Sequence, residues 1–301
     1  MGFLLPLDLG IVMGLVMVWP VLALALAYRL FNFPDLTVEG SFALGAATFA
    51  AFAQAGAAAP AALGAAIAAG AVLGAMTAAI HSWLHLNKFL AAIIVVAISY
   101  TLSLRVMAGP NIGLLTADSP YALGSGLDQA LPGAQLGTMA FLAALMAAGL
   151  LLIRLGATST WGLRLRTAGS NPIHAESLGL STGWHLMAGL AATNGLAGLG
   201  GGLLASYQGF ADASMGQGGL ILALASLTIG ERLVPQLRLT VTGYVLAAAA
   251  VGALVYQIAA AYALRAGLAP TDLKLATALF VLAVVALQKR GRADELADGH
   301  Q

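Results

Sequence analysis

Apolar and polar positions follow one another along this chain in long blocks rather than at short periods. Long, mainly apolar segments occupy residues 11–31, 60–80, 88–108, 136–156, 186–206, 238–262 and 270–288. A helix needs about 20 such residues to cross the hydrocarbon core of a bilayer. Each of these segments is therefore predicted to be a transmembrane helix.

Two further apolar segments, 41–55 and 218–230, are shorter and each follows a polar cluster. Short apolar segments are typical of broken or re-entrant helices, which occur where protein or water surrounds the irregular backbone. The pattern predicts an all-α integral membrane protein, a polytopic transmembrane helical bundle of about eight or nine spans with broken or re-entrant segments. No polar tract is long enough for a soluble domain, so residues 1–301 are expected to form a single membrane domain.

The composition agrees with this fold class. Hydrophobic residues make up 60% of the chain and charged residues only 8%, against roughly 25% charged residues in an ordinary globular protein. A net charge of +1 provides no basic excess for binding nucleic acid. The chain has no cysteine, which excludes disulfides, thiolate metal sites and cysteine nucleophiles.

The positions of lysine and arginine predict an orientation, because cytoplasmic loops are enriched in both residues. If the C-terminus is cytoplasmic, the cytoplasmic ends collect Arg29, Lys88, Arg154, Arg164, Arg166, Arg232, Arg238, Lys289, Arg290 and Arg292. Only Arg105, Arg265 and Lys274 then lie outside. This assignment puts the N-terminus and the 109–135 loop outside, and the 157–185 loop and the 289–301 tail in the cytoplasm.

Motifs of catalytic sites are missing. A Walker A loop requires a Gly-Lys pair, but Lys88, Lys274 and Lys289 follow Asn, Leu and Gln. His81 and His85 share a helical spacing without the glutamate of a metalloprotease motif. The chain is therefore not expected to be an enzyme, and no metal site is predicted.

Acidic residues near membrane depth are more informative, because an ionised carboxylate at the centre of a spanning helix costs about 2.5–3.5 kcal/mol. Asp35, Glu39 and Asp212 are the candidates. If the backbone is helical, Asp35 and Glu39 lie on one face, with the hydroxyl groups of Thr37 and Ser41 beside them. Two interpretations stay open, a solvated loop at the interface and a polar lining of a cavity.

The two polar breaks also resemble each other. Phe33-Pro34-Asp35-Leu36-Thr37 and Phe210-Ala211-Asp212-Ala213-Ser214 share a Phe-x-Asp-x-hydroxyl pattern. Paired interruptions in the two halves of a transporter indicate a binding site near the middle of the membrane. In the predicted topology the two breaks enter from opposite sides.

The 157–185 loop contains a predicted short helix. Asn171 suits the N-cap, Pro172 the first helical position and Gly179 the C-terminal stop. Its apolar side chains are Ile173, Ala175 and Leu178. The helix is interpreted as a docking element for a partner, with a connector on the membrane surface as the alternative.

Taken together, these segments resemble a known family. The matching segments, spread in order over most of the chain, are Phe33 to Ala46, the loop with Gly169, Asn171, Ala175 and Gly179, Tyr207 to Gly216, Ile229-Gly230-Glu231 and Gly267 to Lys274. The chain resembles ABC importer permeases of the branched-chain amino acid transport permease family, most closely those assigned to tryptophan and tyrosine transport.

The resemblance implies several partners. It implies a second permease copy as a homodimer, a cytoplasmic ATP-binding subunit that holds ATP and Mg, and an external solute-binding lipoprotein. It also implies a multi-pass protein of the bacterial inner membrane, with the lipid bilayer as its surroundings, no nucleic acid and no cofactor in this chain.

The resemblance also assigns roles to residues. The expected substrate pathway includes Phe33, Asp35, Thr37, Glu39, Gln208, Phe210, Asp212 and Ser214. The expected coupling element for the ATPase includes Gly169, Asn171, Pro172, Ala175, Glu176 and Gly179.

The predicted function is passage of a small solute, an amino acid or related compound, by alternating access driven by the partner ATPase. The alternative is a self-sufficient secondary transporter in which Asp35, Glu39 and Asp212 relay protons or bind sodium. An intramembrane enzyme ranks last, because no nucleophile, base and orienting group cluster in the sequence. The transported solute stays undetermined.

Overall fold

A computed structural model describes residues 5–114, 119–121, 135–235, 240–269, 272, 273, 275–279 and 282. The helices are α1 Leu5–Phe31, α2 Thr37–Gln54, α3 Ala59–Leu84, α4 Lys88–Val106, α6 Leu136–Thr158, α7 Thr160–Ser170, α8 Pro172–Ser177, α9 Thr182–Gln208, α10 Gly219–Leu233 and α11 Val241–Arg265. Two short strands, β1 Asn111–Gly113 and β2 Phe210–Asp212, pair antiparallel. The predicted all-α membrane fold is confirmed.

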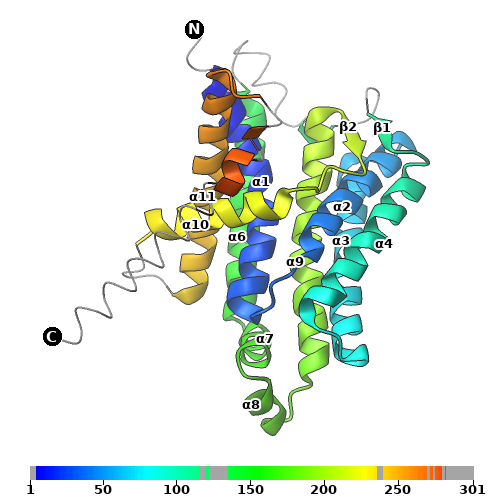
Figure 1. Ribbon diagram of the computed structural model, residues 1–301, viewed down its shortest axis with the longest axis vertical. Helices are drawn as coiled ribbons and strands as arrows, with labels where there is room; N and C mark the ends of the chain where they lie inside the picture. The colour runs from blue at the N-terminus through cyan, green and yellow to red at the C-terminus, as the bar shows by residue number, and fades with distance from the viewer. Residues whose placement is uncertain are drawn as a thin grey trace, which may run out of the picture.

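The long helices form two groups that lie side by side (Figure 1). One group contains α1, α6, α10 and α11, and the other contains α2, α3, α4 and α9. α9 packs mainly against α2 and α3, whereas α1 packs mainly against α11 and also contacts α9. The start of α1 and the β1–β2 ribbon lie at one end of the molecule, and α7 and α8 lie at the opposite end.

Small residues bring α9 close to its neighbours. A Cβ atom on Gly198 would lie 2.3 Å from the carbonyl oxygen of Ala66, and one on Gly201 would lie 1.9 Å from that of Phe42. A side chain at either position would collide with the backbone of α3 or α2. The close packing of α9 on α2 and α3 therefore requires glycine at these two positions.

In the described part of the chain, five helices are long and apolar enough to cross a membrane by length and composition alone. They are α1, α3, α4, α6 and α11. The predicted span at 186–206 corresponds to α9, which has 27 residues but contains many glycines. The total of about eight or nine spans stays a prediction, and the segment 270–288 lies mostly outside the described residues.

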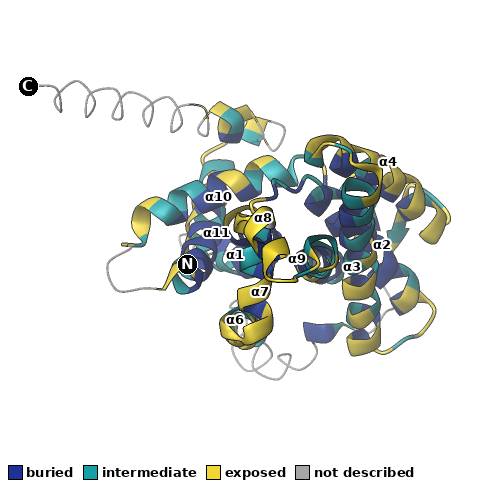
Figure 2. Ribbon diagram, turned by 90° about the horizontal axis from the view of Figure 1, so that it is seen from below, coloured by how far each residue is buried: buried dark blue, intermediate teal, exposed yellow. Residues whose placement is uncertain are grey.

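The structure differs from the prediction at two places. α2 begins at Thr37 rather than near residue 41, so Glu39 lies in its first turn. The 157–185 loop is largely helical, because α7 precedes the predicted short helix. α7 lies across the direction of α6, as the side view and the view from below both show (Figures 1 and 2).

Candidate functional site

The break between α1 and α2 is an irregular segment from residue 32 to residue 35 followed by a turn at residue 36. Asn32 adopts a positive φ of 49°, which ends α1. Phe33 is fully buried and packs edge-on against the ring of His81, with ring centroids 5.5 Å apart. The ammonium of Lys88 donates to the carbonyl oxygen of Asn32 at 2.8 Å, which fixes the break against the start of α4.

Asp35 is the centre of a buried polar network. Its Oδ1 accepts a hydrogen bond from the backbone N–H of Thr37 at 2.9 Å, and its Oδ2 accepts one from Nδ2 of Asn194 at 2.5 Å. Ser41 donates to Oδ1 of Asn194 at 2.7 Å, and the hydroxyl groups of Thr37 and Thr77 lie 2.8 Å apart. All five side chains have no solvent exposure. The network therefore joins α2, α3 and α9, and its carboxylate has a partner on each oxygen.

This arrangement corrects the predicted pairing of Asp35 with Glu39. Asp35 precedes α2 and is not helical. The two acids consequently do not share a helical face. Asp35 contacts α9, whereas Glu39 contacts the beginning of α10.

The second break lies between α9 and α10. Gly209, with a φ of 76°, ends α9, and β2 then leads into a series of turns over residues 213–218. Oδ1 of Asp212 accepts hydrogen bonds from both the backbone N–H and the hydroxyl of Ser214. Gln208, Phe210 and Ser214 are exposed. Asp212 thus stabilises a turn at the end of the molecule that carries the β1–β2 ribbon.

The two breaks meet at Glu39. Oε1 of Glu39 accepts a hydrogen bond from the backbone N–H of Leu220, in the first turn of α10, at 2.9 Å. A negative charge at this place interacts favourably with the positive end of the helix dipole. A Cβ atom on Gly216 would lie only 2.1 Å from the carbonyl oxygen of Glu39, so the turn rests directly on α2. The two matching Phe-x-Asp patterns, by contrast, differ in their surroundings. Phe33 and Asp35 of the first pattern are fully buried, whereas Phe210 of the second is exposed.

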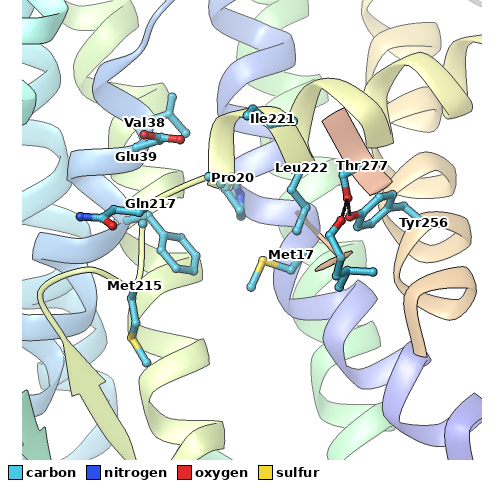
Figure 3. Close-up of a pocket in the computed structure, with 15 residues that line it drawn as sticks. Met17, Pro20, Val38, Glu39, Met215, Gln217, Ile221, Leu222, Tyr256 and Thr277 are labelled. Carbon is cyan, nitrogen blue, oxygen red and sulfur yellow. Dashed lines mark hydrogen bonds between the residues drawn. The ribbon is translucent and has the colours of Figure 1, made fainter. Parts of the chain in front are cut away.

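Cavities flank this junction on both sides. One, of about 270 Å³, lies between the two helix groups (Figure 3) and is lined by Met17, Pro20, Glu39, Phe42, Met215, Gln217, Leu222, Tyr256 and Thr277. The other, of about 300 Å³, extends toward α4 and is lined by Glu39, Gly40, Val96, Ser99, Tyr100 and Gln217. Glu39 and Gln217 line both cavities.

The first cavity is mainly apolar, with polar groups at two places. Figure 3 shows Glu39 and Gln217 on one side and the hydrogen-bonded hydroxyl groups of Tyr256 and Thr277 on the other. A mainly apolar cavity with a few fixed polar groups is the usual form of a small-molecule site. The sequence provided no signal for Gln217, Tyr256 or Thr277.

The short helix α8 has the predicted caps. Oδ1 of Asn171 accepts a hydrogen bond from the backbone N–H of His174 at 3.0 Å, and Gly179 adopts a φ of 75° two residues beyond the helix. Ile173 is 82% exposed and Leu178 is 60% exposed, as expected for a contact surface. Ala175, however, is fully buried, so the prediction that it contributes to that surface is wrong.

α8 is connected to the rest of the molecule through α7. A Cβ atom on Gly169 would lie 2.6 Å from Cα of Phe31, so α7 crosses directly over the last residue of α1. Oε1 of Glu176 accepts a hydrogen bond from the hydroxyl of Thr182 at 3.0 Å, which ties α8 to the first turn of α9. Of the candidate coupling residues, Gly169 therefore contacts the end of α1, and α8 is held by α7 and α9.

No group of three or more potential metal ligands occurs within the described ranges. An ion pair joins Arg29 at the end of α1 to Glu231 near the end of α10.

Comparison of the sequence with known proteins identifies a family and two relatives. The family model described as "Branched-chain amino acid transport system / permease component" matches residues 7–286. A tyrosine transport system permease protein of Clostridioides difficile (strain R20291) is 29% identical over 265 residues, which cover 88% of this chain and 85% of the relative. An uncharacterized protein, RP368, of Rickettsia prowazekii (strain Madrid E) is 29% identical over 281 residues, which cover 92% and 95%. No solved structure matches significantly.

Proposed function

The chain belongs to the family of permease components of branched-chain amino acid transport systems, and on this premise we propose that it forms the translocation pathway of an ABC-type importer. The proposed solute is an amino acid or related compound. The relative named for tyrosine transport supports this class of solute. A permease component is not the catalytic subunit, so ATP and Mg are proposed to bind to a separate cytoplasmic subunit.

The meeting of the two breaks at Glu39 is the observation that carries the proposed pathway. Irregular backbone at membrane depth is tolerated where it lines a cavity or is buried in protein, and both breaks here converge on one carboxylate. Glu39 and Gln217 line cavities on both sides of the junction. A displacement of α10 relative to α2 would break the contact of Glu39 with Leu220 and connect these cavities.

The other end of the molecule supports coupling to an ATPase. Ile173 and Leu178 on and after α8 are exposed, and Gly169 joins α7 to the end of α1. A force on α8 would therefore reach Phe31 and the break that leads into α2. We propose that α8 is the coupling helix and that alternating access follows from this connection.

The proposed assembly contains a second copy of this chain, the cytoplasmic ATP-binding subunit and an external solute-binding lipoprotein. Its proposed location is the bacterial inner membrane. The cavities are mainly apolar, which supports the proposal that the external protein provides most of the affinity for the solute and this chain provides the pathway.

Retention of the ATPase by the tagged permease tests this proposal. The permease is co-expressed with the proposed ATP-binding subunit and purified by a tag on the permease. We expect Ile173→Glu to abolish retention of the ATPase, because it places a charge at the centre of the exposed apolar surface of α8. Ser170→Glu, an equivalent charge at an exposed position on α7, is the control and is expected to retain the ATPase.

One result would overturn the proposal. Uptake by the purified chain alone in liposomes, driven by a proton or sodium gradient, together with no retention of the ATPase, would identify a secondary transporter.

A further inference from the structure

A third cavity, separate from the two at Glu39, lies beside the last turns of α1. It has a volume of about 180 Å³ and lies between α1, α6, α7 and α9. Its lining is almost wholly apolar and includes Leu26, Leu30, Ile153, Leu165 and Leu196. None of these residues lines the cavities at Glu39.

The helix beside this cavity has the character of an interfacial helix. α7 lies across the direction of the long helices (Figure 2), with Gly162, Leu165 and Ala168 buried. Trp161 and Leu163 are 46% and 60% exposed. A helix in the plane of a membrane typically presents tryptophan, leucine and basic residues in this way.

One arginine side chain lines this cavity, and two more lie on the adjoining helices α6 and α7. Arg166 lines it, and Arg154 on α6 and Arg164 on α7 are exposed nearby in sequence. In the described part of the chain the one ion pair joins Arg29 to Glu231. Arg154, Arg164 and Arg166 therefore form no ion pair with a carboxylate there.

We propose that this cavity holds an acyl chain of an anionic phospholipid, with the lipid phosphate bound at Arg166. The occupant follows from the surroundings. The cavity lies beside α6, whose exposed side chains Leu151, Leu152 and Leu155 are apolar, and a lipid tail matches such an apolar lining. Arginine at the rim favours a negative headgroup, because its guanidinium forms paired, charge-assisted hydrogen bonds with phosphate.

The bound lipid would act on the position of α7. Phe31 lines the cavity and also lies directly beneath Gly169. A lipid tail between α1, α6 and α7 therefore fixes the angle at which α7 carries α8. This cavity shares no lining residue with the two cavities at Glu39, so its occupancy can be measured without knowing the transported solute.

Trp161 provides a reporter for the site, because it lines the cavity. In a Trp83→Phe, Trp184→Phe background, the remaining Trp19 is buried with only 1% exposure. The full chain is reconstituted in phosphatidylcholine vesicles that contain a small fraction of brominated phosphatidylglycerol or, for comparison, brominated phosphatidylcholine. We expect stronger quenching of Trp161 by the brominated phosphatidylglycerol.

Two variants and their controls decide the outcome. Arg166→Gln is expected to lower the preference for phosphatidylglycerol about fivefold. The control Arg265→Gln, at the C-terminal end of α11, is expected to leave the preference unchanged. Ala192→Phe, which places a ring in the cavity, is expected to reduce quenching, whereas Leu152→Phe, exposed on α6, does not. Equal quenching by the two lipids, or a preference that survives both Arg166→Gln and Ala192→Phe, overturns the proposal.

Discussion

Asn194, inside the helix bundle, uses both its amide nitrogen and its amide oxygen in hydrogen bonds. Asn194 donates to Asp35 and to the carbonyl oxygen of Leu190, and it accepts from Ser41. In an environment without water, an unmade hydrogen bond has no solvent to replace it. Asn194 therefore fixes the position of the first break relative to α9.

Replacing Asn194 tests this role. Asn194→Leu leaves Asp35 without one of its donors and Ser41 without its acceptor, and each orphaned group costs about 1–3 kcal/mol. We expect the variant to unfold at a clearly lower temperature in detergent than the parent chain. The neighbouring Thr193→Val removes only a bond within α9, to Leu190, and is expected to unfold close to the parent. Equal midpoints for the two variants would contradict the role assigned to Asn194.

Glu39 accepts a hydrogen bond from Leu220 and also carries a charge. Glu39→Gln tests the contribution of the charge separately from that of the hydrogen bond. Glutamine keeps an oxygen that accepts from Leu220 but removes the negative charge from both cavities. If the charge attracts the solute, uptake is expected to fall at least about tenfold, which corresponds to one lost ionic hydrogen bond, while the unfolding temperature stays the same. Glu231→Gln, which weakens only the exposed pair with Arg29, is the control. Unchanged uptake in Glu39→Gln would leave Glu39 a purely structural residue.

Several residue roles follow from the sequence alone because they depend on local geometry. Asn171 and Gly179 bound α8 as expected, since capping involves only neighbouring backbone groups. Asn194 was not among the candidates, although a lone amide inside an apolar span is itself a signal. The burial of Ala175 depends on the rest of the molecule, which the local pattern of a short helix does not reveal.

At the scale of helices, the positions of glycine decide which elements touch. Gly169 allows α7 to cross Phe31, and Gly216 allows the second break to rest on Glu39. In both cases a Cβ atom would collide with the backbone of the neighbouring segment. The connections between α8, α1 and α2, and between α2 and α10, therefore depend on small residues at crossing points.

Gly169→Ala tests the connection from α8 to α1. Its Cβ atom would lie 2.6 Å from Cα of Phe31, so α7 has to move away from α1. We expect the reconstituted transporter to hydrolyse ATP but to take up less solute for each ATP hydrolysed. In the control Gly64→Ala, the new Cβ atom meets nothing within 4 Å, and helix stability is expected to rise by about 0.5–1 kcal/mol. An unchanged ratio of solute taken up to ATP hydrolysed in Gly169→Ala would show that the contact between α7 and α1 does not transmit motion from α8.

Helix existence was more predictable than helix boundaries. Apolar length identified α1, α3, α4, α6 and α11, because length and apolar composition can be read directly from the sequence. The start of α2 was predicted too late in the chain, because its first turn carries the polar residues Thr37 and Glu39. Both residues have hydrogen-bond partners inside the protein. The β1–β2 ribbon was not predicted, because its three-residue strands lack a pattern of their own.

The whole molecule has two chemically different ends, and its orientation decides which partner meets which end. The β1–β2 ribbon and the exposed Ser214 lie at one end, and α8 with Ile173 lies at the other (Figure 1). The distribution of lysine and arginine predicts that the α8 end lies in the cytoplasm. Only this orientation lets α8 meet an ATP-binding subunit while the ribbon faces an external solute-binding protein.

Because the chain has no cysteine, single cysteines can test the orientation directly. Ile173→Cys and Ser214→Cys both lie at exposed positions at opposite ends. With a membrane-impermeant maleimide, we expect Ser214→Cys to react in cells whose outer membrane alone is permeable, and Ile173→Cys to react only after the inner membrane is opened. Labelling in the reverse order would place α8 outside, where it has no ATP to couple to, and would remove the basis for the importer mechanism. Labelling of both positions from one side would mean that the two ends do not face opposite compartments, which contradicts the fold as a membrane-spanning unit.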